Sequence, residues 1–194
     1  KNMSEIQANK LSPSSGTALQ IGDSGDTITI PSGATITNSG TATGFGGDNT
    51  PSFFATLSAD TTISDDTSTK IQCNTEVVDT DNAYDNSTNF RFTPQTAGKY
   101  YVFGYVQINA SSGKLNQFKT EIKKNGSSHF DSESDFVSDV NSRMGKEASG
   151  IIDFNGSSDY VELYAVGNIT GGSVTVKSDG GLKTRFGAYK LIGV

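Results

Sequence analysis

The 194-residue chain has no tryptophan, one cysteine, one histidine and only four prolines. A single cysteine excludes a disulfide framework within the chain, and a single histidine without a cysteine partner excludes the usual zinc sites. No apolar run approaches the roughly 18 residues of a membrane-spanning helix, and no apolar signal-peptide core follows Lys1. We therefore expect neither membrane insertion nor transition-metal catalysis. Because the first residue is not Met, we expect a fragment or a processed product.

Basic residues are also scarce. The chain carries 15 Lys and Arg against 21 Asp and Glu, which gives a formal net charge of −6 and a pI near 4.7. Binding to nucleic acid or to an anionic membrane depends on clustered Lys and Arg, whereas the basic residues here are scattered. The sequence therefore predicts no nucleic-acid partner.

Apolar residues are distributed unevenly along the chain. Hydrophobic residues make up 33% of the sequence, and nearly all of the aromatic ones follow Gly47. Only the C-terminal part can therefore bury a normal core. This division predicts a lead-in segment over residues 1–16, a second segment over 17–48 and a globular head over 49–194.

Residues 17–48 alternate isoleucine with Thr and Ser, and Gly-containing turns divide them into very short pieces such as ITIPSG and ATITNSG. Single strands with so few apolar residues cannot bury a core, so they need neighbours from other copies of the chain. The pattern favours a slender β-rich trimeric shaft. A flexible linker rich in Gly, Ser and Thr is the alternative.

From Asn49 onward, short alternating runs are separated by turn dipeptides such as Asn125-Gly126 and Asn155-Gly156. About ten short strands without a convincing helix favour an all-β jelly-roll sandwich. The predicted strands are Ser52–Ser58, Thr69–Asn74, Glu76–Asp79, Asn89–Thr93, Tyr100–Asn109, Lys119–Lys124, Glu147–Phe154, Tyr160–Val166, Ser173–Lys177 and Arg185–Ile192.

Several motifs follow one another in a recognisable order. They include Asn82-x-Tyr84-Asp85, Phe90-x-Phe92-x-Pro94, Gly98-x-Tyr100-Tyr101, Lys124-Asn125-Gly126 and the closing Phe186-Gly187-Ala188-Tyr189. In this order they resemble the globular head of complement component 1q and its tumour-necrosis-factor-like relatives, over roughly Pro51 to Val194. The resemblance implies a ten-stranded jelly roll that assembles as a homotrimer, and it does not imply complement activity.

The chain departs from this family in two places. Val102 stands where the family usually has another aromatic after the Tyr-Tyr pair, and no collagen-like Gly-X-Y stalk precedes the head. The preceding residues instead resemble repeats of phage and marine-virus fibre proteins. A stalk and a trimeric head together are similar to the tip of a tail or head fibre.

Aromatic residues and turn residues first indicate packing. We expect Gly98 to adopt a positive φ at a bend and Pro94 to end the preceding strand. Cys73, in an alternating run, is expected to be a small buried hydrophobe. Six aromatics are expected in the core or in a subunit interface: Tyr84, Phe90, Phe92, Tyr100, Phe103 and Phe186.

The residues offer little for catalysis. Gly22-Asp23-Ser24-Gly25 superficially matches the surroundings of a serine nucleophile, but the only imidazole is His129 in a polar segment, so we expect a turn and no enzyme. Asp79, Asp81 and Asp85 form an oxygen-rich set that calcium favours. Some relatives of the complement head bind calcium near the trimer axis, so these three are the candidate calcium ligands.

The polar stretch Ser127–Lys146 is predicted to be a long loop, and long loops of compact domains commonly carry function. We expect Phe130, Asp135 and Phe136 to contact a receptor. The favoured function is a non-enzymatic virion fibre tip that is a homotrimer, binds a host surface glycan or protein, and contacts other virion proteins through its upstream region. The alternatives are a secreted, extracellular recognition protein of the complement-head type and a purely structural capsid decoration.

Overall fold

The computed structural model describes residues 11–40, 49–111, 115–136 and 143–192. The chain separates into two compact units, residues 1–43 and 44–194, which are described one at a time. In the described residues every regular element is a β-strand. Within them, no helix has the length and apolar character that crossing a membrane requires.

Residues 11–40 form turns and extended backbone without strand pairing. Asp26 N donates to Asp23 O at 3.0 Å and Ala34 N donates to Pro31 O at 3.1 Å, which places tight turns at two of the Gly-containing steps. A single chain therefore forms none of the short strands predicted for residues 17–40. The isoleucines of this segment are all exposed: Ile21, Ile28, Ile30 and Ile36.

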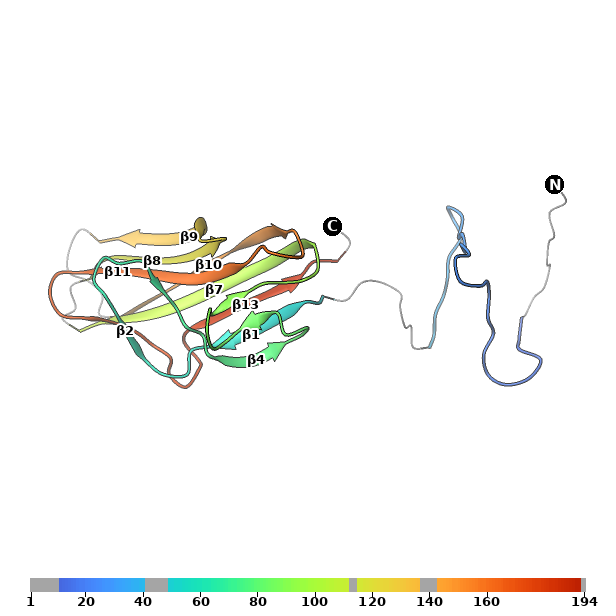
Figure 1. Ribbon diagram of the computed structural model, residues 1–194, viewed down its shortest axis with the longest axis horizontal. Helices are drawn as coiled ribbons and strands as arrows, with labels where there is room; N and C mark the ends of the chain where they lie inside the picture. The colour runs from blue at the N-terminus through green and yellow to red at the C-terminus, as the bar shows by residue number, and fades with distance from the viewer. Residues whose placement is uncertain (1–10, 41–48, 112–114, 137–142, 193–194) are drawn as a thin grey trace. The chain divides into compact units, whose positions relative to one another are not determined.

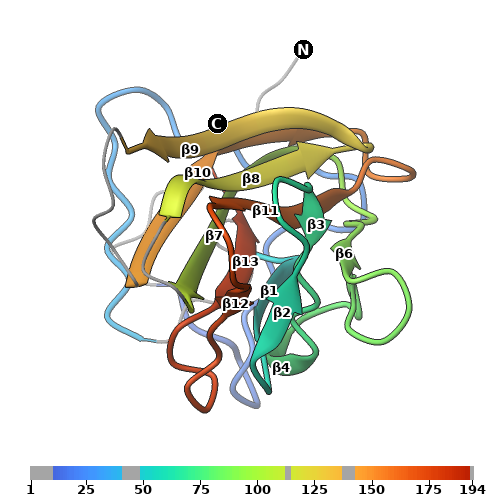
Figure 2. The same cartoon turned by 90° about the vertical axis from the view of Figure 1, so that its left-hand side faces the viewer.

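The head consists of two antiparallel sheets packed face to face (Figures 1 and 2). Sheet A has the order β2 (Thr61–Ile63), β12 (Val174–Val176), β7 (Gly98–Ala110), β13 (Arg185–Lys190), β1 (Ser52–Thr56) and β4 (Thr75–Asp79), with β10 (Arg143–Phe154) on the other side of β7. Sheet B has the order β5 (Tyr84–Asp85), β6 (Arg91–Phe92), β11 (Val161–Ile169), β8 (Leu115–Lys124) and β9 (Ser127–Asp135), with β3 (Thr69–Lys70) on β11.

Strand β7 organises sheet A. It pairs with β10 along nearly its whole length and with β13 and β12 on its other side. From Tyr100 to Ala110 its even-numbered residues are buried and its odd-numbered residues are half-buried. Because successive side chains of a strand point to opposite faces, the even residues line the core and the odd residues face away from it. Both faces of this strand are apolar over much of its length, as the sequence predicted.

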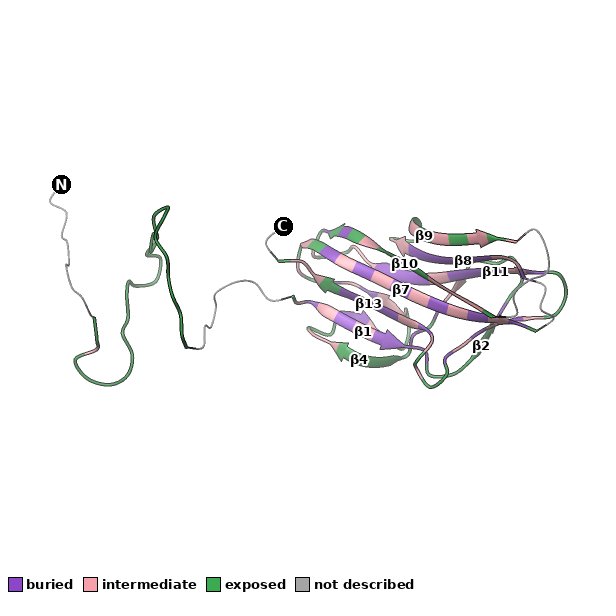
Figure 3. Ribbon diagram, turned by 180° about the vertical axis from the view of Figure 1, so that it is seen from behind, coloured by how far each residue is buried: buried purple, intermediate pink, exposed green. Residues whose placement is uncertain are grey.

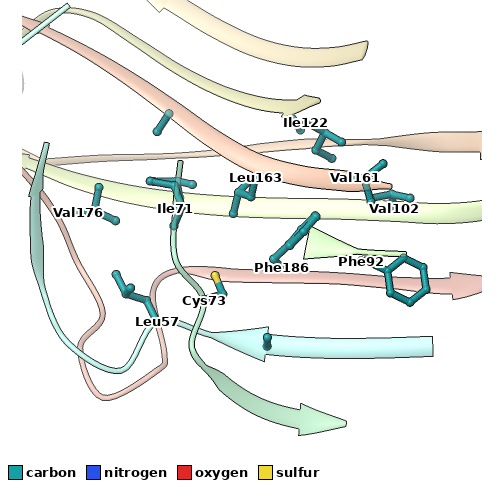
Figure 4. Close-up of a cluster of buried hydrophobic side chains, with 14 of the residues drawn as sticks. Leu57, Ile71, Cys73, Phe92, Val102, Ile122, Val161, Leu163, Val176 and Phe186 are labelled. Atoms are coloured by element: carbon teal, nitrogen blue, oxygen red, sulfur yellow. The ribbon is translucent and has the colours of Figure 1, made fainter. Parts of the chain in front are cut away.

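Aromatic rings fill one end of the core. Phe53 stacks on Tyr84, with centroids 4.5 Å apart, and on Phe92 at 4.6 Å, and it meets the edge of Phe186 at 5.0 Å. The Tyr84 hydroxyl donates to the carbonyl of Cys73 at 2.8 Å, which satisfies the polar end of a buried ring. Figure 4 shows the aliphatic continuation of this core. The expectation that Tyr84, Phe92 and Phe186 pack in the core is confirmed.

Glycine at 104 allows the two sheets to approach each other. A Cβ on Gly104 would lie 2.3 Å from Leu163 Cδ1, which is closer than real carbon atoms come. Gly98 begins β7 with a φ of +141°, so the positive φ predicted for this bend is confirmed.

Several predicted elements need correction. Ser127–Lys146 is not a long loop, because β9 occupies its first nine residues and β10 begins at Arg143. The predicted strand Thr69–Asn74 pairs only at Thr69–Lys70. The strands β2 and β5 were not predicted, since each has too few residues to show a period.

Candidate functional site

The outward face of sheet A carries a cluster of half-buried aromatic side chains. Tyr101 and Phe103 project from β7, and Phe54 projects from β1. Gly187 of β13 lies between Phe54 and Phe103 in the strand register. A Cβ on Gly187 would lie 2.5 Å from Phe103 Cζ, so only glycine leaves room for this ring.

The rings of this cluster contact one another. Phe103 lies 6.2 Å from Phe54 and 6.0 Å from Tyr101, measured between centroids, and Tyr101 lies 5.6 Å from Tyr189. Val78 of β4 pairs with Phe54, and Ile151 of β10 pairs with Tyr101, so both share this face. We call these residues the aromatic face: Phe54, Val78, Tyr101, Phe103, Ile151 and Tyr189.

The aromatic face is partly open to solvent and is hollowed on one side. Val78 is 48% exposed, Ile151 56% and Tyr189 38%. A hollow of about 350 Å³ lies over β1, β4, β7 and β13, and its walls include Phe54, Val78, Phe103 and Tyr189. Figure 3 shows the alternation of buried and half-buried residues along β7 and the exposed strand β4 at the edge.

Charged side chains flank the aromatic face at both ends. Lys99 and Asp153 form an ion pair with Nζ and Oδ1 2.8 Å apart. On the other side of the aromatic face, in the middle of β7, Arg185 lies 4.6 Å from the centroid of the Tyr105 ring, and Glu147 pairs with Tyr105 in the strand register. An apolar centre with a charged border is the common anatomy of a protein interface.

The outward face of sheet B is different, because its two buried carboxylates are paired with lysines of the same chain. Lys70 Nζ lies 2.5 Å from Glu162 Oε1. Lys123 Nζ lies 3.6 Å from Glu121 Oε2 and 4.0 Å from the centroid of the Tyr164 ring. Both carboxylate residues are buried. The buried charges of this face therefore have partners within the chain.

The three residues predicted to contact a receptor do not share a loop. Phe130 lies within β9, where its ring occupies the space over Gly150 that a Cβ would fill. Phe130 and Phe136 both pack against the core. Asp135 Oδ1 accepts a hydrogen bond from Gln117 Nε2 at 3.0 Å. The rest of the predicted loop, residues 137–142, lies outside the described residues.

The three carboxylates predicted to bind calcium have different surroundings. Asp79 accepts hydrogen bonds from the backbone N–H groups of Ala83 and Tyr84, and Asp81 has a φ of +68° in the intervening turn. The pKa of Asp85 lies well below its usual range, first because the Thr88 N–H donates to it. In the described part of the chain, no three His, Cys, Asp or Glu side chains are grouped to hold a metal ion. In one chain Asp79 and Asp85 thus act as turn acceptors.

The other candidate reactive groups have structural surroundings. Cys73 is fully buried, and burial raises the pKa of its thiol to about 12. The His129 ring meets the Phe130 ring edge-on, with centroids 4.7 Å apart. Ser24 and Gly25 lie in a turn that the Asp23 N–H to Asp26 Oδ2 hydrogen bond closes, so the predicted turn is confirmed.

The aromatic face was not predicted as a distinct surface. Phe103 was expected in the core or in a subunit interface, and Phe54, Tyr101 and Tyr189 were assigned to neither. The signal was present in KYYVFGY, because an alternating strand with apolar residues on both faces must cover something on each side.

No protein-family model matches the chain. No curated protein matches it either. Among solved structures, the chain resembles murine APRIL at pH 8.0, with 10% identity and a TM-score of 0.53, and murine APRIL at pH 5.0, with 13% identity and a TM-score of 0.52. Each match covers 72% of this chain and 98% of the other chain. Eiger TNF from S. frugiperda matches with 12% identity, 72% and 90% coverage and a TM-score of 0.49.

At these identities the matches to murine APRIL show the fold alone. The head has the jelly-roll fold of tumour-necrosis-factor-like proteins, and the all-β jelly roll predicted from the sequence is confirmed.

Proposed function

We propose that this chain is a non-enzymatic adhesion protein that works as a homotrimer joined through the aromatic face. The exposed, hollowed aromatic face is the observation that carries the proposal. Soluble monomers rarely expose contiguous apolar patches of this kind, and such patches with polar borders mark sites of protein association. The jelly-roll fold, which the sequence resemblance associates with trimers, supports the same assembly.

The aromatic face contains two different surfaces that could meet in a closed assembly of three subunits. A closed ring of copies needs head-to-tail contacts, in which one surface of a chain meets another surface of the next. The hollow lies between Val78 and Phe103, whereas Ile151 protrudes from β10 at the opposite edge of sheet A. In the proposed ring, Ile151 of one copy fills the hollow of its neighbour.

One pair of charges fits this orientation. On the outward face, β10 carries Glu147 beside Ile151, and β13 carries Arg185. Glu147 of one copy and Arg185 of the next are the opposite charges that come together when β10 lies along β13. Charges of this kind at an interface favour the correct orientation more than they add affinity.

Native mass measurement tests the assembly. The whole chain is expected at three times 20.4 kDa, and Val78→Asp is expected to reduce it to monomers because the charge enters the hollow. Val77→Asp is the matched control, since Val77 is the adjacent residue, is 60% exposed and does not line the hollow. A native monomer, or equal dissociation of both variants, would reject the aromatic face as the interface.

The proposed fibre role places residues 17–48 in a β-rich shaft and the head at the tip of a virion fibre. The exposed isoleucines of residues 17–40 favour a shaft, because three copies can bury them against one another. In this role the head binds a host surface glycan or protein, and the segment upstream contacts other virion proteins. The secreted recognition protein remains the second candidate, supported by the fold alone.

Limited proteolysis tests the shaft. Ile30→Asp places three like charges together in a shared interior, so it is expected to expose residues 17–46 to rapid cleavage while the head remains trimeric. Thr29→Asp is the matched control, because adjacent residues of a strand point to opposite sides. If the unmutated segment is cleaved as rapidly as the Ile30→Asp segment, residues 17–48 are a linker.

Adhesion is tested by competition of the purified protein with virions for host cells. Phe130 and Phe136 pack against the core, so changing them would disturb the fold as well as any binding. Asp135→Lys is the cleaner change, and it is expected to weaken competition if β9 contributes to the contact. Full competition by Asp135→Lys would place the receptor contact elsewhere on the head.

A further inference from the structure

A second hollow lies between the two sheets, at the side of the head where β2 of sheet A and β3 of sheet B are both short. Its volume is about 180 Å³. Four aliphatic side chains form its walls, and four residues with polar side chains complete its lining. The lining consists of Leu57, Ile63, Ile71 and Val176 together with Thr61, Thr69, Lys70 and Gln72.

The aliphatic walls come from different segments of the chain. Figure 4 shows Leu57, Ile71 and Val176 arranged around a common space. Leu57 follows β1, Ile71 follows β3 and Val176 ends β12. Strand β3 pairs for only two residues, after which Ile71 N donates to Leu163 O and the chain leaves the ladder. The hollow lies beside the point at which β3 stops pairing.

The hollow is uncharged. The Lys70 ammonium is engaged outside it, because Nζ lies 2.5 Å from Glu162 Oε1 and donates to Asn89 O at 3.1 Å. The side chains of Thr61 and Gln72 make no hydrogen bond with any residue that the structure describes, and Gln72 is exposed. A hollow with four aliphatic walls and an exposed amide at its border suits a neutral ligand that carries one polar group.

We propose that this hollow binds one small neutral molecule with an apolar ring or a short branched chain, whose single hydroxyl or amide pairs with Gln72. The size supports a ring, since an engineered apolar cavity of about 150 Å³ in another protein binds benzene. The four aliphatic walls offer water no hydrogen bonds, so the apolar part of a ligand is expected to lie against them, with its polar group toward the polar side of the lining. The site is separate from the aromatic face, so its occupancy does not depend on the proposed assembly.

Phenol is the probe that fits this description. The whole chain, labelled at its Ile, Leu and Val methyl groups, is titrated with phenol and followed by NMR. The methyl signals of Leu57, Ile63, Ile71 and Val176 are expected to shift, whereas those of Val78 and Ile151 on the aromatic face are expected to stay. Benzoate, with the same ring and a negative charge, is expected to bind at least about tenfold more weakly because desolvating the carboxylate is costly.

Two tryptophan variants on one strand provide the control. Thr61→Trp places a bulky side chain against the hollow and is expected to weaken phenol binding by about tenfold or more. Thr62→Trp is equally exposed on β2 but does not line this hollow, so it is expected to bind phenol as the unmutated protein does. Unshifted wall methyls at millimolar phenol, or equal binding by both variants, would overturn the proposal. Tight binding of benzoate would overturn the claim that the hollow prefers a neutral ligand.

Discussion

The outward faces of the two sheets differ in how far one chain completes them. On sheet B, Lys70 and Lys123 are paired with buried glutamates, so the polar groups have partners within the chain. On sheet A, Phe54 contacts Phe103 and Tyr101 contacts Tyr189, but these rings remain partly open to water. Both sheets cover the same core, so the difference between their outward faces reflects what each face contacts outside the chain's own core. A face that is incomplete in one chain is the face at which another copy is expected.

The largest expected effect comes from a charge on the aromatic face. Phe103→Asp is expected to weaken self-association by roughly a thousandfold or more, because truncating a central interface residue also leaves a buried charge. The head is expected to remain folded, since Phe103 lies outside the core. Sedimentation with a parallel unfolding curve measures both properties.

An aromatic-to-aspartate substitution beside sheet B, at the residue before β11, sharpens the comparison. Tyr160→Asp removes a ring whose centroid lies 4.5 Å from the Arg91 guanidinium carbon and leaves an aspartate near that cation. This variant is expected to assemble normally. If it dissociates as Phe103→Asp does, the two faces are not functionally different.

A smaller effect is expected from breaking a pair on sheet B. Glu162→Gln removes the charge that faces Lys70, and it is expected to lower the free energy of unfolding by about 1–3 kcal/mol, because the glutamate is buried while the lysine is partly exposed. Lys99→Ala, which breaks an exposed pair, is expected to cost no more than about 1 kcal/mol. Urea denaturation at neutral pH measures both values. Equal losses would mean that burial of the sheet B pair has no energetic consequence.

The smallest effect concerns acid stability at the edge of sheet B. The folded-state pKa of Asp85 is lowered by N–H donors from Thr88, Ser87 and Asn89. The ionised Asp85 carboxylate therefore stabilises the folded state above the ordinary aspartate pKa of about 3.9. This contribution is lost as the pH falls through the lowered pKa. Asp85→Asn is expected to lower Tm at pH 6, with a gap from the unmutated protein that narrows below about pH 4. A gap that stays constant from pH 6 to pH 2 would exclude this linkage.

Much of the fold followed from local sequence. The period-two alternation in Tyr100–Asn109 and the turn chemistry at Asn125-Gly126 predicted β7 and the turn between β8 and β9, because both signals depend on neighbouring residues. Strand β9 was missed because SSHFDSESD has almost no apolar residues. It is an edge strand, and its polar side chains face solvent.

The aromatic face was harder to predict, because signals from neighbouring residues do not relate residues that are far apart in the sequence. The aromatic face joins residues from five strands, and nothing local relates Phe54 to Phe103 across Gly187. The loop predicted over Ser127–Lys146 was wrong because polar composition was interpreted as a loop, whereas receptor contact by Phe130, Asp135 and Phe136 stays a prediction. Sequence composition indicates exposure, whereas only the register of β9 shows that Phe130 turns inward over Gly150.

The place where the chain enters and leaves the head has a consequence for modular use. Asn49 Nδ2 donates to Lys190 O at 2.8 Å, and Lys190 N donates to Pro51 O at 3.2 Å. A domain whose entry and exit coincide closes no long gap when it is placed inside another polypeptide, so the entropy cost of such an insertion is small. The head is therefore suited to transplantation into a surface hairpin of an unrelated carrier, where both junctions would lie side by side.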